Sequence, residues 1–431
     1  MTLNTAIKSW QIQPATISGG HLVVSNSVSG TQILSYDASE DSFKWDYLAT
    51  VTINEVPSGD IDGSNKEFTL SNTPLEDSER VYLNGLLQEP GSGKDYTIDG
   101  NKITFATAPE SGDVLLVSYL ISKVLDSNSG YGYVCGGDDS SGNRLSSIER
   151  ITFPFNSGTA NNVGNLSGTR RQFDGCNSTT YGYISAGYST ANLTTIDRFQ
   201  FPFDSGIASH VGNISHKRHG SASCNSSDHG YIAGGYDSPL YLSYVERITF
   251  PFDSGTATDV GDLAVARRHL GGVNCSTYGF FHGGTAVADL VTTIDRIQFP
   301  FNSGSASHVG NLSTAVQNVK GCNASTYGYN LGGADSSYNC FSNIQRFQFP
   351  FDSGIASHTG DLSGSRRYMT GSNSVTYGYS FGGYDGTNLL DIIDRFVFPF
   401  DSGTASQVGG LNSTRSASAS CDSTDFVSMF V

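Results

Sequence analysis

The chain has 431 residues, of which 51 are glycine; only 15% are charged, and the formal net charge is −16. This composition favours many short strands joined by tight turns, and the negative charge argues against nucleic-acid binding, because an acidic surface repels phosphate groups. No stretch approaches the roughly 18 apolar residues of a membrane span, and the N-terminus lacks a basic start followed by an apolar run, so we expect neither membrane insertion nor a secretory signal.

The N-terminal third predicts two modules. Residues 1–48 form an N-terminal segment that ends in GTQILSYDASEDSFKWDYL (30–48). Residues 49–122 predict a small β-sandwich-like domain. Within it, Asp99-Gly100-Asn101 is a strong hairpin signal. The expected strands are KEFTLS (66–71), RVYLNGLLQ (80–88), YTIDGNKITF (96–105) and DVLLVSYL (113–120).

Residues 123–431 contain six copies of a repeat of roughly 49 residues, each anchored on Phe-Pro-Phe. The prolines are 48, 49, 49, 50 and 49 residues apart, at Pro154, Pro202, Pro251, Pro300, Pro350 and Pro399. Each copy predicts four strands. Examples are RRQFDGCNS (170–178) after a basic pair, YGYVCGG (131–137), IDRFQFPF (196–203) and GIASHVGNIS (206–215).

The third strand of each repeat alternates as a half-buried strand does, with Phe199 and Phe201 on one face. Its proline cannot donate to a sheet ladder and therefore belongs at an edge or a strand end. Asp-Ser-Gly or Asn-Ser-Gly follows in every copy, which is turn chemistry, so strands three and four are expected to form a hairpin.

Length varies at one joint of the repeat. Between the Gly-Gly position and strand three lie 10, 8, 9, 9, 10 and 9 residues, and on a propeller these loops would share one face. The loops carry aromatic side chains beside Asn, Asp and Ser, a mixture suited to stacking on sugar rings. An alternative is that some tyrosines simply cover sheet edges. The candidate binding residues on these loops are Tyr188, Tyr236, Tyr241, Tyr244, Tyr338, Tyr384, Asp385 and Asn388.

The order of Gly-Gly, variable loop, Ile-Asp/Glu-Arg strand, turn and Arg pair resembles the kelch repeat. YIAGGYDSPLYLSYVERITFPF (231–252) followed by ATDVGDLAVARR (257–268) is the best copy, and the resemblance covers about 131–431. The tryptophan of kelch repeats is absent, and Phe-Pro-Phe would fill its volume. The resemblance implies a kelch-like β-propeller over 123–431 and an all-β chain.

The strands do not divide evenly into blades. Six blades are expected if a strand near 415–421 joins the blade that begins with 148–155, which leaves either 131–137 or 425–431 surplus. A seventh, incomplete blade is the alternative.

Charged residues recur at two positions. An acidic-Arg pair such as Asp197-Arg198 occurs in five copies, and Gln345-Arg346 replaces it in the sixth. Because adjacent strand residues face opposite ways, each Arg is expected to pair with another strand or loop. Basic pairs recur at Arg170-Arg171, Lys217-Arg218, Arg267-Arg268 and Arg366-Arg367, interrupted by Val316-Gln317. They either bond loop carbonyls of the next blade or line a mouth that binds anionic sugars.

No metal or cofactor is expected. Cys176, Cys224, Cys275 and Cys322 recur at one repeat position, and Cys421 rejoins the series after Ser372 interrupts it. Equivalent positions of neighbouring blades lie too far apart for a disulfide, and the absence of a CxxC pair argues against zinc. We therefore interpret these cysteines as small buried residues of a reduced protein. His210, His308 and His358 share a repeat position and are expected at turns or edges. The sequence has no HExxH or nucleophile-elbow motif, so we expect a binding protein rather than an enzyme. Loop carboxylates such as Asp138-Asp139 or Asp385 leave polysaccharide cleavage as a minor alternative.

The N-terminal modules resemble those at the front of bacteriophage tail-fibre and other virion proteins. The run GTQIL-YD-SFKW, VYLNGLLQ, and DYTIDGNKITF--AP--GD-L-V-Y (95–119) carry this resemblance. It implies a virion structural protein made in the host cytoplasm. Its N-terminal region would bind other virion proteins, and its propeller would present loops to a host-surface glycan or receptor, as a homotrimer. A capsid-decorating or other purely structural virion protein is the alternative.

Overall fold

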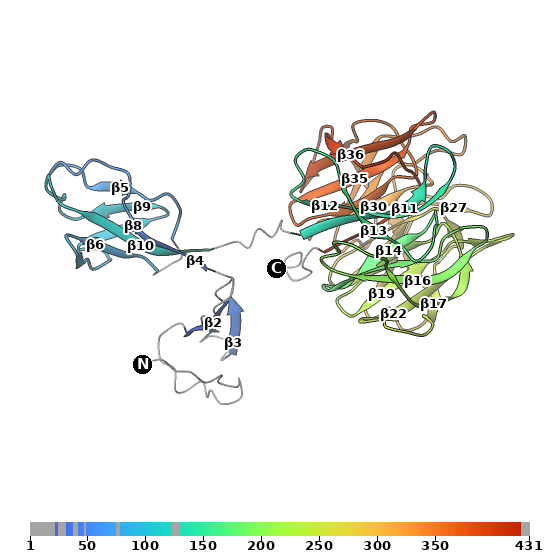
Figure 1. The fold of residues 1–431 in the computed structure, drawn as a ribbon, viewed down its shortest axis with the longest axis horizontal. Helices are drawn as coiled ribbons and strands as arrows, with labels where there is room; N and C mark the ends of the chain where they lie inside the picture. Colours follow the sequence, from blue (N-terminus) through green and yellow to red (C-terminus); the bar gives the residue numbers. More distant parts are fainter. Residues whose placement is uncertain are drawn as a thin grey trace. The chain divides into compact units, whose positions relative to one another are not determined.

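The structure is a computed structural model that describes residues 22–24, 32–37, 42–46, 49–74, 78–122 and 130–423. Every regular element in these ranges is a β-strand, which confirms the prediction of an all-β chain (Figure 1). The chain divides into two compact units, Met1–Asp126 and Ser127–Val431. The surplus segment 425–431 lies outside the described residues.

The described residues of the first unit form three small antiparallel sheets. β1 (Leu22–Val24), β2 (Gln32–Asp37) and β3 (Ser42–Asp46) form one. A second has the order β4 (Ala49–Glu55), β10 (Leu115–Ser122), β6 (Arg80–Leu83) and β7 (Leu86–Leu87). The third has the order β5 (Glu67–Thr69), β9 (Lys102–Phe105) and β8 (Tyr96–Asp99).

The last two sheets share one apolar core. Phe68 and Ile103 from one sheet and Val81 and Val117 from the other are fully buried in it. The hairpin predicted at Asp99-Gly100-Asn101 joins β8 to β9 as expected. The single strand predicted over 80–88 is wrong: the chain reverses at Asn84 and Gly85, whose φ angles of 53° and 80° form a tight turn between β6 and β7.

Residues 130–423, the described part of the second unit, form six four-stranded antiparallel sheets in a β-propeller-like arrangement. In chain order, sheet 1 is β38 (Ala419–Asp422), β11 (Gly130–Asp138), β12 (Arg144–Phe153) and β13 (Asn161–Asn165). Sheet 2 is β14 (Asp174–Asn177), β15 (Tyr181–Ser185), β16 (Leu193–Gln200) and β17 (Ser209–Arg218). Sheet 3 is β18 (Ala222–Asn225), β19 (His229–Ala233), β22 (Tyr244–Thr249) and β23 (Thr258–Asp262).

The remaining sheets repeat this order. Sheet 4 is β25 (Gly271–Asn274), β26 (Tyr278–His282), β28 (Thr293–Gln298) and β29 (Ser307–Asn311). Sheet 5 is β30 (Lys320–Asn323), β31 (Tyr327–Leu331), β32 (Asn343–Gln348) and β33 (Ser357–Asp361). Sheet 6 is β34 (Thr370–Asn373), β35 (Tyr377–Tyr384), β36 (Leu389–Val397) and β37 (Ser406–Gly410). Two short ribbons add β20 (Tyr236–Asp237) with β21 (Leu240–Tyr241), and β24 (Arg267–Arg268) with β27 (Thr285–Ala286).

Sheet 1 combines the two ends of the second unit. β38 pairs with β11, and Cys421 lies opposite Tyr133. A C-terminal strand therefore joins the sheet that contains 148–155, as predicted, and 131–137 is not surplus, because it supplies the second strand of that sheet.

Neighbouring sheets meet through their first strands. β14 lies beside β18, and the same relation continues through β25, β30, β34 and β38, which in turn lies beside β14. A cycle of six backbone hydrogen bonds follows the same path, each 2.7–3.0 Å long. It runs from the N–H of Gln172 to Ala417, and on through Tyr368, Asn318, His269 and Gly220 to the carbonyl of Gln172. All six residues have φ between 54° and 67°.

The Phe-Pro-Phe segments pack between sheets. Strand three ends before each proline, as predicted. The first Phe stacks on the ring at the centre of the second strand of the preceding sheet, as Phe201 does on Tyr133 at 5.3 Å. All six junctions contain such a stack, with centroids 5.0–5.3 Å apart. The motif therefore supplies the bulky aromatic filling that was expected in place of tryptophan.

The arginine of each acidic-Arg pair also joins two sheets. Arg198 donates to the Phe252 carbonyl at 3.4 Å and to the Asp253 carboxylate in the Asp-Ser-Gly turn of the next sheet. The hairpin between strands three and four, which places that turn, is present in every repeat. The expectation that each Arg pairs with another loop is confirmed.

One cysteine alignment is wrong. Cys176, Cys224, Cys322 and Cys421 occupy one register position, opposite an aromatic residue of the second strand, but Val273 takes that position in sheet 4, and Cys275 lies two residues later. All seven cysteines are free, and six are buried, in agreement with their interpretation as small core residues.

Candidate functional site

The six variable loops begin at equivalent places. The residue after each glycine pair, or after Ala186-Gly187 in sheet 2, forms an antiparallel bridge with the residue that follows the repeated buried arginine position, for example Tyr236 with His219. Adjacent loops also touch: Asn192 donates to the Tyr236 carbonyl at 3.1 Å and to Asp237 at 2.9 Å. We call the surface formed by these loops, 138–147, 188–195, 236–244, 285–293, 334–343 and 384–392, the loop face.

Five of the six candidate tyrosines gather beside arginine side chains. The Arg268 guanidinium lies 4.5 Å from the ring centroid of Tyr236 and 5.4 Å from that of Tyr241. Arg367 lies 4.9 Å from the Tyr338 centroid and 5.0 Å from the Tyr384 centroid. At these distances the ring faces attract the cations, so the arginines and tyrosines hold one another in place.

Tyr188 lies in the same kind of cluster. The Arg144 guanidinium, in loop 138–147, lies 5.0 Å from its ring centroid. The Arg171 guanidinium, just before the first strand of sheet 2, lies 5.4 Å from the same centroid. The ring also makes an edge contact with His219 at 5.8 Å. These tyrosines are partly buried by the loop edges, and Tyr338 is the most exposed of them at 51%. The five tyrosines therefore cover the edges of the loops and also keep part of each ring accessible to solvent.

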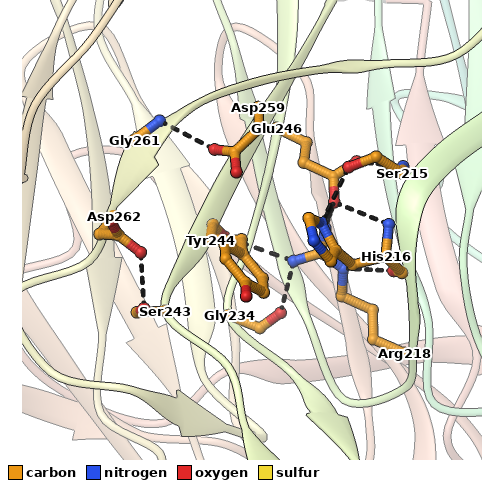
Figure 2. A network of polar contacts seen from close by, with 10 residues as sticks. All are labelled: Ser215, His216, Arg218, Gly234, Ser243, Tyr244, Glu246, Asp259, Gly261 and Asp262. Atoms are coloured by element: carbon orange, nitrogen blue, oxygen red, sulfur yellow. Dashed lines mark hydrogen bonds and ion pairs between the residues drawn. The ribbon is translucent and has the colours of Figure 1, made fainter.

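Tyr244 stands apart from this group. Its ring stacks on His216 at 3.9 Å, and its carbonyl accepts from Arg218 at 3.3 Å. Figure 2 shows it within the buried network around Arg218 and Glu246. The structure therefore does not bring Tyr244 together with the other candidates.

Asp385 and Asn388 hold a turn. The Asp385 carboxylate accepts from the backbone N–H groups of Thr387 at 2.7 Å and Asn388 at 2.6 Å, and these bonds lower its pKa. Asp139 and Asp335 cap their loops in the same way, with Asn143 and Asn339 as partners. The exposed residues Asp385 and Asn388 therefore help to fix the shape of the loop face.

A buried arginine supports the start of most loops. Arg218 and Glu246 are an ion pair with fully buried side chains, and Arg218 also donates to the Gly234 carbonyl at 3.0 Å (Figure 2). The same pairing recurs as Arg170–Asp197, Arg267–Asp295, Arg366–Asp394 and Arg415–Glu149. The buried arginines bond carbonyls and carboxylates of the sheet that follows in the chain. Bonds to the carbonyls of the next blade were one of the two roles predicted for the basic pairs.

Sheet 5 replaces this ion pair with neutral residues. Val316 stands at the arginine position and Gln345 at the acidic position, so both departures noted in the sequence fall in one sheet. The Gln345 side-chain oxygen accepts from the Ser313 N–H at 2.8 Å, as Glu246 accepts from Ser215 at 2.6 Å. Loss of the buried cation thus coincides with loss of the buried anion.

The basic pairs contain two different positions. The buried arginine is the first member in Arg170-Arg171 but the second in Lys217-Arg218, so His219 is the structural equivalent of Arg171. Arg415 is a further buried arginine, and it does not belong to a basic pair, because Ser416 follows it. Adjacent side chains point opposite ways, which separates the buried position from the one on the loop face.

Two hollows lie along the line of first strands. One, of about 30 Å³, is lined by the hydrogen-bonded cycle that includes Gln172, His269, Asn318 and Tyr368. The other, of about 70 Å³, is lined by the ring Asn177, Asn225, Asn274, Asn323, Asn373 and Asp422. In that ring, successive backbone N–H groups donate to the side-chain oxygen of the next residue at 3.2–3.5 Å.

Lys320 lines both hollows. Its Nζ lies 3.0 Å from the Asp174 carboxylate and donates to the Phe173 carbonyl at 3.1 Å. Sheets 2 and 5, which supply these residues, are three sheets apart in the cycle, so the pair joins opposite strands.

The described residues contain no group of three or more His, Cys, Asp or Glu side chains placed to hold a metal ion. His210, His308 and His358 lie exposed on the fourth strand of their sheets, the edge position expected for them. Within the ranges that the structure covers, no helix is long and apolar enough to cross a membrane. No protein-family model matches the chain, and no curated protein is recognisably similar to it in sequence.

Proposed function

We propose that the chain is a bacteriophage virion protein, a tail-fibre or receptor-binding subunit that attaches through residues 1–48 and presents the loop face to a host-surface glycan. The observation that carries this proposal is the gathering of Tyr188, Tyr236, Tyr241, Tyr338 and Tyr384 on neighbouring loops of a repetitive scaffold. Aromatic faces beside polar loop groups suit the alternating apolar and hydroxyl surfaces of sugars.

The scaffold is proposed to be a closed, six-bladed, kelch-like propeller. The cycle of first strands and the matching cycle of hydrogen bonds support closure. So does the bond from Arg395 to the Phe155 carbonyl at 3.2 Å, which repeats between sheets 6 and 1 the contact found at every other junction. An experimental structure tests this: six sheets around one axis are expected, and a linear array or a seventh blade would contradict the proposal.

A protein that binds polysaccharide without cleaving it agrees with the direction in which the pKa values of the loop carboxylates are shifted. A glycosidase acid needs a raised pKa, whereas hydrogen bonds lower the pKa of both Asp139 and Asp385. Asp138 is 2.9 Å from the Arg171 guanidinium. The proposal therefore expects host polysaccharide to be bound and recovered intact.

Particle attachment tests the function. Removal of residues 130–423 is expected to abolish attachment to host cells while particles still assemble, and removal of 1–48 is expected to abolish incorporation of the subunit. Tyr241→Ala and Tyr338→Ala, alone and combined, should weaken attachment. His210→Ala, an exposed ring on a fourth strand, is the matched control.

Three outcomes contradict the proposal. If particles without 130–423 fail to assemble, or assemble and still attach to host cells, the chain is a purely structural virion protein, as a capsid-decorating subunit would be. Release of oligosaccharides from bound polysaccharide would make it an enzyme. Absence of the chain from particles would remove the virion assignment altogether. The proposed trimer is measured separately, by the mass of the purified protein.

A further inference from the structure

The loop face has an uneven charge pattern at one repeated position. The residue after the buried arginine position bridges to the start of the variable loop in each of the six sheets. In chain order these residues are Arg171, His219, Arg268, Gln317, Arg367 and Ser416. Arginine therefore occupies alternate members of the cycle, and neutral or weakly basic residues lie between.

Two of these arginines lack an acidic partner. Among the described residues, no carboxylate lies within ion-pair distance of Arg268 or Arg367, whereas Arg171 pairs with Asp138. Arg367 donates to the Tyr338 carbonyl, and both guanidinium groups lie over tyrosine rings. Their charges remain uncompensated in a chain whose net charge is −16, so an anion would be attracted to this place more than to the surrounding acidic surface.

The three arginines lie beside a chain of ring contacts that reaches the smaller hollow. The Arg367 guanidinium lies 5.8 Å from the ring centroid of Tyr368, and the Tyr368 ring contacts that of His269 at 6.0 Å. His269 contacts His219 at 6.4 Å, and His219 contacts the rings of Tyr188 and Tyr236, over which Arg171 and Arg268 lie. His269 and Tyr368 both line the hollow. Burial and the neighbouring Tyr338 raise the pKa of Tyr368, but Arg367, Arg268 and Arg171 all act to lower it.

The floor of this hollow contains unused hydrogen-bonding groups. Asn318 is 4% exposed, lines the hollow, and has no hydrogen-bond partner for either its side-chain oxygen or its nitrogen among the described residues. Buried polar groups are rarely left without partners. A cavity of about 30 Å³ has room for one water-sized group, so a ligand would enter it with a single small polar group.

We propose that this mouth, comprising Arg171, Arg268, Arg367 and the hollow lined by Asn318, binds a carboxylate-bearing saccharide. Guanidinium groups bind carboxylates through paired, charge-assisted hydrogen bonds. The tyrosines beside them supply faces for the sugar ring, and Asn318 would bond a group that enters the hollow. The inference rests on the proposed glycan-binding function and names the chemical class of the glycan.

The neutral histidines keep this charge pattern fixed near neutral pH. Burial lowers the pKa of His219 to about 4, with help from Arg268 and Arg171, and its Nδ1 lies 2.7 Å from the Asn192 side-chain oxygen. Burial likewise lowers the pKa of His269, again with Arg268 contributing. At pH 7 the arginines alone are therefore expected to supply the positive charge at the mouth.

Binding of the full chain to a panel of uronate- and sialate-containing oligosaccharides tests the inference, with the same oligosaccharides after carboxyl reduction as neutral partners. At least one acidic member is expected to bind roughly tenfold or more tightly than its reduced form, because carboxyl reduction removes the charge-assisted hydrogen bonds to the arginines. Arg268→Gln and Arg367→Gln should each remove about tenfold of this affinity, and Arg268→Lys should retain part of it. Lys102→Gln, which removes one positive charge from the first unit, is the control and should bind as the parent does.

The failures are distinguishable. If only neutral glycans bind and the arginine variants bind them normally, the inference falls but the glycan-binding function stands. If no glycan binds and particles attach without 130–423, the proposed function falls as well. If a polyglutamate peptide binds while every acidic saccharide fails, the mouth recognises acidic peptides instead. Unfolding temperatures of the variants within the error of the parent exclude misfolding as the cause of lost binding.

Discussion

Replacing both members of the buried Arg218–Glu246 pair is expected to destabilise the protein far less than replacing either member alone. The Arg218→Val variant leaves Glu246 fully buried without its cation, and the Glu246→Gln variant leaves Arg218 buried without its anion. Removing one partner of a buried ion pair costs about 3–5 kcal/mol, whereas replacing both by well-packed neutral groups is often close to neutral.

The chain contains the doubly neutral arrangement already, in sheet 5. Val316 and Gln345 are 1% exposed there, and Gln345 still accepts the Ser313 N–H. In the double variant, the amide oxygen introduced by Glu246→Gln would accept from Ser215 in the same way. The Gly234, Tyr244 and His216 carbonyls would lose the Arg218 donor, but His216 is half-buried, so water can replace the donor there. At about 1 kcal/mol for each lost neutral hydrogen bond, the double variant should lie within about 2 kcal/mol of the parent.

Thermal unfolding measures the difference. At roughly 2 °C per kcal/mol for a unit of this size, each single variant should unfold roughly 6–10 °C below the parent, and the double variant within about 4 °C. The reciprocal graft is the internal control: Val316→Arg should destabilise sheet 5, and adding Gln345→Glu should restore it. A double variant as unstable as the sum of the two single variants would refute the reasoning.

Three further predictions concern other sites. Burial, with Arg267 adding to it, lowers the pKa of His282 to about 3 from the usual 6.5; on acidification the unfolded chain therefore binds a proton that the folded chain rejects. Stability should fall between about pH 6.5 and pH 3, by on the order of 3 kcal/mol from pH 7 to pH 4, and urea unfolding should show His282→Leu to be less acid-sensitive; an unchanged pH slope would contradict this. Asp174→Asn or Lys320→Met should weaken stability by about 1–3 kcal/mol and speed hydrogen exchange in β14 and β30, with the first unit as the unaffected control. Gly85→Ala should lower the unfolding temperature of the first unit, since φ of 80° costs about 1–2 kcal/mol for an L-residue although no atom blocks the Cβ; a neutral result would show that the turn relaxes.

Much of the second unit could be predicted because its signals are local and repeated. Phe-Pro-Phe, the Asx-Ser-Gly turn and Tyr-Gly-Tyr each mark one strand boundary, and their recurrence fixes the four-strand order. Register was harder, because residue type alone does not determine it: Cys275 was aligned with the other cysteines, but pairing places Val273 opposite Phe280. At Asn84-Gly85 a strong turn signal was present, but flanking apolar residues made the segment resemble one strand.

The candidate site was predictable in its tyrosines but not in their partners. The place of Tyr236 and Tyr384 directly after the glycine pair, and of Tyr188 after the equivalent Ala186-Gly187, follows from the sequence. Which arginine of a pair is buried depends on strand phase, and Lys217-Arg218 shows that phase can differ from the visible pair. Asn318 carries no sequence signal, since its unpaired amide is apparent only when the first strands are assembled.

The pairing of β38 with β11 has a consequence for synthesis of the protein. A ribosome makes β11, β12 and β13 before the five other sheets, yet the fourth strand of their sheet is encoded near the end of the second unit. During translation the edge of β11 stays without its partner strand β38 while about 280 further residues are added. At roughly 5–20 residues per second this takes tens of seconds. An unpaired strand edge invites association with other chains, so nascent copies on one messenger run the risk of exchanging their last strand with a neighbour.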